Sequence, residues 1–242
     1  MARPFQLRPC RASAPGPLGS HGRSTRARLQ VTRRAVAPAV VVIQEIFGVN
    51  AVMRELTDHY AAQGYLAICP DLFWRIEPGI DITDQSEAEW KRAFELFNAF
   101  DVETGLTDIA ATIEAVRQRT DVNGKVGAVG YCLGGLLAYL TATRTDCDAS
   151  VSYYGVGLEK YTAEADKLAR PLLIHIAEED QFTPRPVQGL IIAALKNHPQ
   201  IEIHTYPGRD HAFARPGGEH YDAADAALAE ARSLAFFQKN LA

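Results

Sequence analysis

The chain has 242 residues, of which 47% are hydrophobic, and this is enough for one globular domain with a sizeable core. Its formal net charge of −4 is unevenly spread, because residues 1–37 contain eight arginines and no acidic residue. Residues 38–242 therefore carry a formal net charge of −12, which argues against nucleic-acid binding. The longest uncharged run, 126–143, is interrupted by four glycines, so we expect no membrane span.

Residues 1–37 are rich in Arg, Pro, Ala, Ser and Gly without helical or strand periodicity, which predicts a poorly ordered basic segment. An organelle transit peptide, a basic RNA-binding arm and a wrongly assigned start remain open interpretations. Residues 38–242 form one predicted domain. The four cysteines show no CxxC or His/Cys spacing, so we expect a reduced, cytoplasmic protein without disulfides or a structural zinc site.

From residue 38, short apolar runs alternate with helical patterns. The runs that predict buried strands are 40–44, 65–69, 126–131, 149–153, 171–176 and 201–206. Helices are expected at 50–63, 86–99, 102–119, directly after Cys132, at 186–196 and at 221–239. Asn50 and Ser86 are the expected caps of the first two helices, and 155–170 is expected to be a mobile, charged connection. The alternation predicts an α/β fold with a mostly parallel, doubly wound sheet and helices on both faces.

The central feature is a Gly-X-Cys-X-Gly turn between a strand and a helix, with Cys132 at its apex. Glycines two residues before and after a nucleophile allow the sharp bend of a nucleophile elbow, which exposes the reactive atom above the sheet. The helix N-terminus that follows favours a thiolate. A buried structural cysteine in a Gly-rich packing turn is the alternative interpretation.

Four candidate residues follow predicted strands: Glu45, Cys132, Asp180 and His211. Because reactive groups lie at the carboxyl ends of parallel strands, we expect them to meet. The order nucleophile, acid, histidine is that of the α/β-hydrolase fold. His211 is then the base that activates the thiol, and Asp180 orients it. Two further histidines, His175 and His204, lie within strands and are expected in the core.

Acyl transfer also requires donors for the developing oxyanion. The backbone N–H groups of Leu133 and Ile46 occupy the positions that this fold uses. Glu45 lies between an apolar strand and Ile46, so we expect a partly buried carboxylate beside the thiol that exchanges a proton with Cys132. A surface salt bridge is the alternative role for Glu45.

The sequence resembles the dienelactone hydrolase family (carboxymethylenebutenolidases) of α/β-hydrolases. The matching stretches are 44–50, 69–72, 130–135, 153–160 and 211–215. The resemblance implies a Cys132/His211/Asp180 triad, with Glu45 pairing with the thiol and helping to release the thiolate when substrate binds. It also implies hydrolysis of a small carboxylated lactone through an acyl-enzyme, to maleylacetate in the dienelactone case, without metal or organic cofactor.

Two departures from the family pattern concern the substrate and the N-terminus. In the best-known members an arginine joins the counterpart of Arg215 in binding the substrate carboxylate, whereas ungapped alignment places Trp90 there. Arg75, Lys91 or Arg92 could substitute for that arginine, or the substrate could be less anionic or more aromatic. The expected pocket residues are Arg215, Trp90, Phe94, Phe47, Tyr154 and Phe213. Residues 1–37 also lack the strand pair that usually leads into the family's sheet.

We therefore expect a cysteine-dependent hydrolase of small lactones or activated esters, acting as a monomer or homodimer on a small-molecule substrate. One alternative is a general carboxylesterase or thioesterase in which Arg215 has no role. Another is a non-catalytic, redox-sensing protein of the hydrolase fold, in which Cys132 is oxidised rather than acylated.

Overall fold

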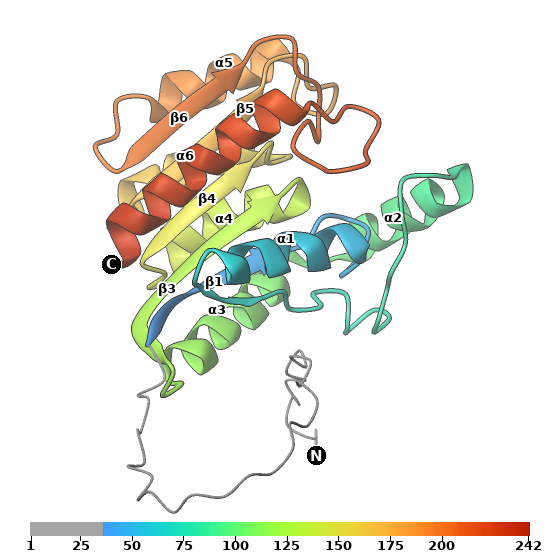
Figure 1. Ribbon diagram of the computed structural model, residues 1–242. Helices are drawn as coiled ribbons and strands as arrows, with labels where there is room; N and C mark the ends of the chain where they lie inside the picture. Colours follow the sequence, from blue (N-terminus) through green and yellow to red (C-terminus); the bar gives the residue numbers. More distant parts are fainter. Residues whose placement is uncertain (1–35) are drawn as a thin grey trace, which may run out of the picture. The chain divides into compact units, whose positions relative to one another are not determined.

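A computed structural model describes residues 36–242 (Figure 1). We expect residues 1–37 to be poorly ordered, and residues 1–35 of this segment lie outside the described residues. The described chain folds around a six-stranded sheet in the order β2-β1-β3-β4-β5-β6. The strands are β1 (Ala37–Ile43), β2 (Leu66–Ile68), β3 (Val122–Tyr131), β4 (Ala149–Tyr153), β5 (Leu172–Ala177) and β6 (Ile201–Tyr206). Every pairing among them is parallel, which confirms the predicted doubly wound sheet.

Helices cover both faces of the sheet. They are α1 (Ala51–Ala62), α2 (Glu87–Ala99), α3 (Val102–Arg117), α4 (Leu133–Arg144), α5 (Arg185–Leu195) and α6 (Ala223–Leu241). Figure 1 shows α1 and α6 in front of the sheet, with α4 behind it. Because both faces are covered, the central strands are continuous apolar runs; residues 39–43 of β1 are fully buried.

Local capping signals are confirmed. The Asn50 side chain accepts a hydrogen bond from the Met53 amide at the start of α1. The Ser86 hydroxyl accepts one from the Glu89 amide at the start of α2 and donates to the Glu89 carboxylate at 2.8 Å. Both side chains satisfy backbone N–H groups that a helix N-terminus leaves unpaired, so the sequence alone located these helix starts.

The connection 155–170 and His204 differ from expectation. The connection contains the 3₁₀ helix η1 (Leu158–Lys167), whose Leu158 is buried and whose Tyr161 carbonyl accepts a hydrogen bond from the Tyr139 hydroxyl at 3.0 Å. The connection thus forms a 3₁₀ helix held by a few contacts, although it is rich in charged residues. His204 is not in the core, because β6 is the edge strand and leaves its side chain 25% exposed beside Glu202.

The turn between β3 and α4 has the predicted sharp geometry. Cys132 has φ 58° and ψ −116°, a conformation in which a non-glycine residue is strained. A Cβ atom on Gly130 would lie 1.9 Å from the Gly134 carbonyl oxygen. One on Gly134 would lie 2.3 Å from the carbonyl oxygen of Ile43 in β1. Only glycine fits at either position, so the elbow needs both.

Candidate active site

Cys132 lies at the carboxyl end of β3 and caps α4, with 9% of its surface exposed. Its own amide donates to the carbonyl of Tyr153 at the end of β4, which fixes the turn to the neighbouring strand. The thiol therefore sits at the positive end of the α4 dipole, where a thiolate is favoured.

The predicted triad residues come together at this edge of the sheet. His211, in the loop after β6, places Nδ1 2.8 Å from Oδ2 of Asp180, in the loop after β5. The other carboxylate oxygen of Asp180 accepts hydrogen bonds from the amides of Phe182 and Thr183, which holds the carboxylate in place. Cys132 and the same imidazole line one cavity. His211 therefore neighbours both the acid and the thiol.

The surroundings of His211 favour its charged form. Burial disfavours the imidazolium, but the negative charges of Cys132 and Asp180 outweigh this and raise the pKa of His211 to about 10. Burial also acts on the free thiol of Cys147, whose pKa it raises to about 11. His175 differs from His211, since burial in the core lowers its pKa well below 6.5; this histidine is the expected core residue.

The two backbone amides expected as oxyanion donors have no acceptor in the described part of the chain. The amides of Leu133 and Ile46 donate to no other group within residues 36–242. Leu133 is the first residue of α4, where amides have no intrahelical acceptor, and Ile46 follows the carboxyl end of β1. Neither amide is therefore used by the fold itself.

Glu45 and Arg215 form a buried ion pair that extends to a third residue. Arg215 Nη1 lies 3.1 Å from Glu45 Oε2, and Arg215 Nη2 lies 2.6 Å from Asp84 Oδ2. The three side chains are only 4%, 9% and 11% exposed for Glu45, Arg215 and Asp84. Glu45 Oε1 and Arg215 Nε are buried without a hydrogen-bond partner in the described part of the chain.

A small apolar cavity of about 60 Å³ opens on the thiol. Its lining residues are Ile46, Phe47, Trp90, Phe94, Phe97, Cys132, Val156, Phe182, His211 and Arg215. The Trp90 and Phe94 rings stack with centroids 5.6 Å apart, and Phe47 meets Trp90 edge-on at 5.1 Å. A more polar cavity of about 360 Å³ shares Trp90 and Arg215 with it and is also lined by Asp84. The site can therefore hold a flat apolar group close to Cys132.

Two of the expected pocket residues lie elsewhere. Phe213 is fully buried and packs against Tyr206 and Tyr154, and it lines neither cavity. Tyr154 is also buried, with its ring 5.0 Å from that of His211, so it supports the imidazole rather than facing the cavity. Both follow strands closely, and the sequence could not separate the layer beneath the imidazole from the pocket wall.

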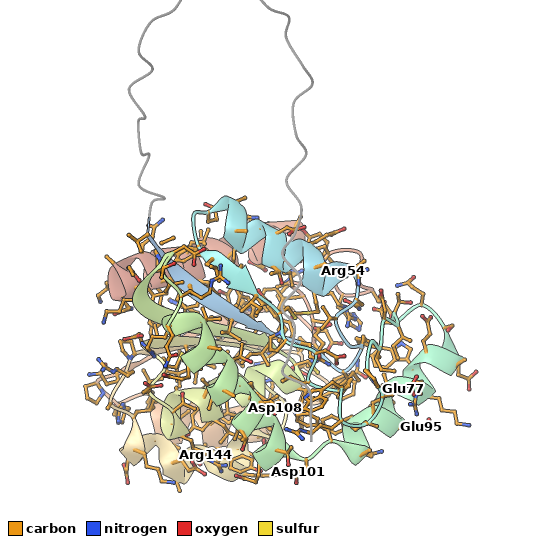
Figure 2. All side chains as sticks on the ribbon, turned by 90° about the horizontal axis from the view of Figure 1, so that it is seen from below. Arg54, Glu77, Glu95, Asp101, Asp108 and Arg144 are labelled. Atoms are coloured by element: carbon orange, nitrogen blue, oxygen red, sulfur yellow. The ribbon has the colours of Figure 1, made fainter. Side chains whose placement is uncertain are left out.

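Three residues were candidates to replace the second carboxylate-binding arginine of the family, and none of them lines the cavity. Arg75 pairs with Asp108 at 2.8 Å, and Arg92 pairs with Glu77 and Glu95. Figure 2 labels the acidic partners of both arginines, Asp108, Glu77 and Glu95, the last of which lies on α2. Lys91 is exposed. Arg215 is thus the only arginine or lysine among the lining residues of these two cavities within the described chain.

The comparisons with known proteins agree with this geometry. The model of the dienelactone hydrolase family matches residues 26–241. The chain belongs to the dienelactone hydrolase family. It is 44% identical over 203 residues to a carboxymethylenebutenolidase of Pseudomonas putida, covering 84% of this chain and 86% of the relative. A candidate carboxymethylenebutenolidase of Azospirillum brasilense is 50% identical over 206 residues, covering 85% and 88%.

Solved structures support the fold of this dienelactone hydrolase family member. A candidate dienelactone hydrolase from Klebsiella pneumoniae matches with a TM-score of 0.73 and 27% identity, covering 85% of this chain and 88% of that one. The expectations of an α/β-hydrolase fold and of a hydrolase are therefore confirmed. Within residues 36–242, no helix is long and apolar enough to cross a membrane.

Sequence reasoning missed several residues of the site. Asp84 gave no signal, because it lies 131 residues from Arg215 in the chain. Phe182 lines both cavities and meets the His211 ring edge-on at 4.8 Å; its place two residues after Asp180 was a usable signal. Phe97, one turn of α2 beyond Phe94, follows from helical periodicity once Phe94 is placed in the pocket.

Proposed function

We propose that this chain hydrolyses small lactones or activated esters through an acyl-enzyme on Cys132, with His211 and Asp180 completing the triad. The observation that carries the proposal is the position of His211, bonded to Asp180 at 2.8 Å and lining one cavity with the Cys132 thiol. Membership of the dienelactone hydrolase family and relatives named as carboxymethylenebutenolidases support the substrate class.

In the proposed first half-reaction, the Cys132 thiolate attacks the ester carbonyl carbon, and the carbonyl oxygen becomes an oxyanion. The Leu133 and Ile46 amides donate to that oxyanion. The intermediate then expels the alkoxide or enolate of the substrate, which takes a proton from the His211 imidazolium. This leaves a thioester on Cys132 and a neutral His211 held in its tautomer by Asp180.

In the second half-reaction, His211 removes a proton from water as the water oxygen attacks the thioester carbonyl. The second tetrahedral intermediate expels the Cys132 thiolate and releases the carboxylic acid product. His211 ends protonated beside the thiolate, which restores the ion pair that raises its pKa to about 10. His211 therefore acts as the acid in the first half-reaction and as the base in the second, and both half-reactions use the same pair of oxyanion donors.

Glu45 has a separate proposed role. Its Oε2 pairs with Arg215, whereas its Oε1 has no partner in the described part of the chain. Where Cys132 starts as a neutral thiol beside a neutral His211, we assign to Oε1 the transfer of the thiol proton to His211 when substrate binds, which gives the thiolate and imidazolium with which the first half-reaction begins. Because such a thiol must stay reduced to react, the cytoplasm is the proposed location.

The experiment that tests this proposal is replacement of the nucleophile. Cys132→Ala is expected to lose about a thousandfold or more in kcat/KM on an aryl ester and a lactone, since no other group supplies the thiolate. Cys147→Ala is the matched control, because Cys147 is buried away from His211 and packs against β-strand carbonyls.

Mass spectrometry after rapid mixing with substrate is expected to find the acyl group on Cys132. Hydrolysis that survives in Cys132→Ala would contradict the proposal. An added oxygen atom on Cys132 without any acyl adduct would favour the redox-sensing alternative instead.

A further inference from the structure

Arg215 already binds two carboxylates beside the cavity. Its Nη1 donates to Glu45 and its Nη2 to Asp84. Its Nε is buried near the loop around Gly218, where an added Cβ would lie 2.9 Å away. An incoming carboxylate would therefore approach a guanidinium whose charge two acidic side chains already offset.

Asp84 is held firmly against that displacement. Its carbonyl oxygen accepts a hydrogen bond from Trp90 Nε1 at 3.0 Å, and the preceding Thr83 amide donates to Glu89 at 2.9 Å. On the other side, Asn50 Nδ2 donates to the Ile82 carbonyl at 2.9 Å. The loop is thus fixed both to α2 and to the segment that carries Glu45, so the two carboxylates are held on either side of Arg215.

The charge of this cluster disfavours a third carboxylate. Two carboxylates and one guanidinium carry a formal charge of −1 in a site where every member is less than one-eighth exposed. Like charges repel strongly where water is largely excluded. The small cavity beside Cys132 offers mainly apolar and aromatic surfaces, with Trp90 stacked on Phe94.

We propose that Asp84 is a specificity-determining residue that neutralises Arg215 and makes the site select uncharged esters or lactones with a flat apolar group over carboxylated ones. This inference rests on the proposed hydrolytic function. In this inference, Asp84 binds Arg215 where a substrate carboxylate would otherwise bind. The Trp90 and Phe94 rings contact the apolar group of the substrate.

The test compares two esters that differ only in charge, mono-para-nitrophenyl terephthalate and its methyl ester. The wild-type protein is expected to favour the methyl ester in kcat/KM by about tenfold or more. Asp84→Asn is expected to raise kcat/KM for the carboxylated ester by about tenfold or more, mainly through a lower KM, because the substitution removes one of the two negative charges that offset Arg215.

Asp81→Asn is the matched control, because it removes an acidic charge from the same loop while its side chain contacts Arg54 rather than Arg215. Figure 2 labels Arg54 on α1. The control is expected to leave the ratio between the two esters unchanged. A wild-type preference for the carboxylated ester overturns the inference, and so does an unchanged ratio in Asp84→Asn. The wild-type ratio decides the matter even if Asp84→Asn does not fold.

Binding separates this inference from the proposed function. Calorimetry of the two esters with Cys132→Ala and with Cys132→Ala/Asp84→Asn reports selectivity without turnover. If the wild type hydrolyses neither ester, the proposed function fails, while the binding ratio still tests Asp84. Equal binding of both esters to Cys132→Ala would overturn the specificity role alone.

Discussion

Arg144 and Arg215 each pair with two carboxylates from distant segments, but the two clusters are built differently. Arg144, at the end of α4, donates from Nε and Nη2 to both oxygens of Glu164 at 2.8 and 2.6 Å, and from Nη1 to Glu103 at 2.7 Å. Arg215 makes one contact with each of its partners, and its Nε and one oxygen of Glu45 remain unpaired in the described chain.

This difference in geometry accompanies a difference in position: the Arg144 cluster joins secondary-structure elements, whereas the Arg215 cluster borders the candidate active site. The bidentate Arg144 cluster joins α4 to η1 and α3 at the rim of the domain, where Figure 2 labels the arginine. Its hydrogen bonds lower the pKa of Glu164 to about 2, so the acid stays charged. Lys167 adds a second cation to the Arg144 cluster, 3.4 Å from Glu164, whereas the Arg215 cluster is more buried, carries a formal charge of −1 and borders the cavity beside Cys132. Unsatisfied polar atoms are costly in a core, and in this cluster they lie beside the candidate active site.

The largest expected difference between the two clusters is in the free energy of unfolding that is lost when the arginine is replaced. Arg215→Met leaves two buried carboxylates uncompensated and is expected to cost about 3–5 kcal/mol in the free energy of unfolding. Arg144→Met, whose partners reach solvent more easily, is expected to cost about 1 kcal/mol or less. Urea unfolding at neutral pH measures both. Equal losses would mean that burial does not distinguish the two clusters.

The next largest expected difference is in kcat/KM, when an acidic partner of each arginine is replaced. Glu45→Gln is expected to lower kcat/KM by about a hundredfold, because the amide cannot accept the thiol proton. Glu164→Gln is the control and is expected to leave kcat/KM unchanged. The pH profile of kcat/KM is the second readout, since loss of a proton acceptor shifts its acid limb, whereas a packing defect lowers it uniformly. A Glu45→Gln variant with wild-type rates contradicts the proposed role.

The contribution of the Arg144 cluster to stability is expected to depend on pH. Because hydrogen bonds from Arg144 lower the pKa of Glu164 to about 2 from its ordinary value of 4.5, the stability it contributes is complete above that ordinary value and is lost as pH falls through about 2. Glu164→Gln is therefore expected to lower Tm by about 2–4 °C at pH 6. The difference should vanish near pH 2 in calorimetry. A difference that is constant with pH would show that charge is not its cause.

The smallest expected effect concerns the loop that carries Asp84. Trp90→Phe keeps an aromatic ring beside Phe94 but removes the hydrogen bond to the Asp84 carbonyl, at a cost of about 1 kcal/mol in stability. Selectivity between the neutral and carboxylated esters is expected to change by less than about fivefold. A change larger than that of Asp84→Asn would assign the selectivity to Trp90 rather than to the carboxylate.

Much of the fold and part of the site followed from the sequence. The alternation of apolar runs with capped helices predicted the parallel sheet, and the spacing around Cys132 predicted the turn in which Gly130 and Gly134 have no room for a side chain. The positions of Asp180 and His211 after successive strands predicted that they would meet, because parallel strands end at one edge of the sheet.

The tertiary structure alone decided the partners of Arg215 and the wall of the cavity. Glu45 and Asp84 lie 170 and 131 residues from Arg215 in the chain. Their convergence depends on how three loops stack, which no local pattern encodes. In the same way, Phe213 packs beneath the imidazole and His204 lies on an edge strand because of strand order. Turns and caps depend on neighbouring residues, so sequence determines them; charge pairing and burial depend on which distant segments the fold brings together.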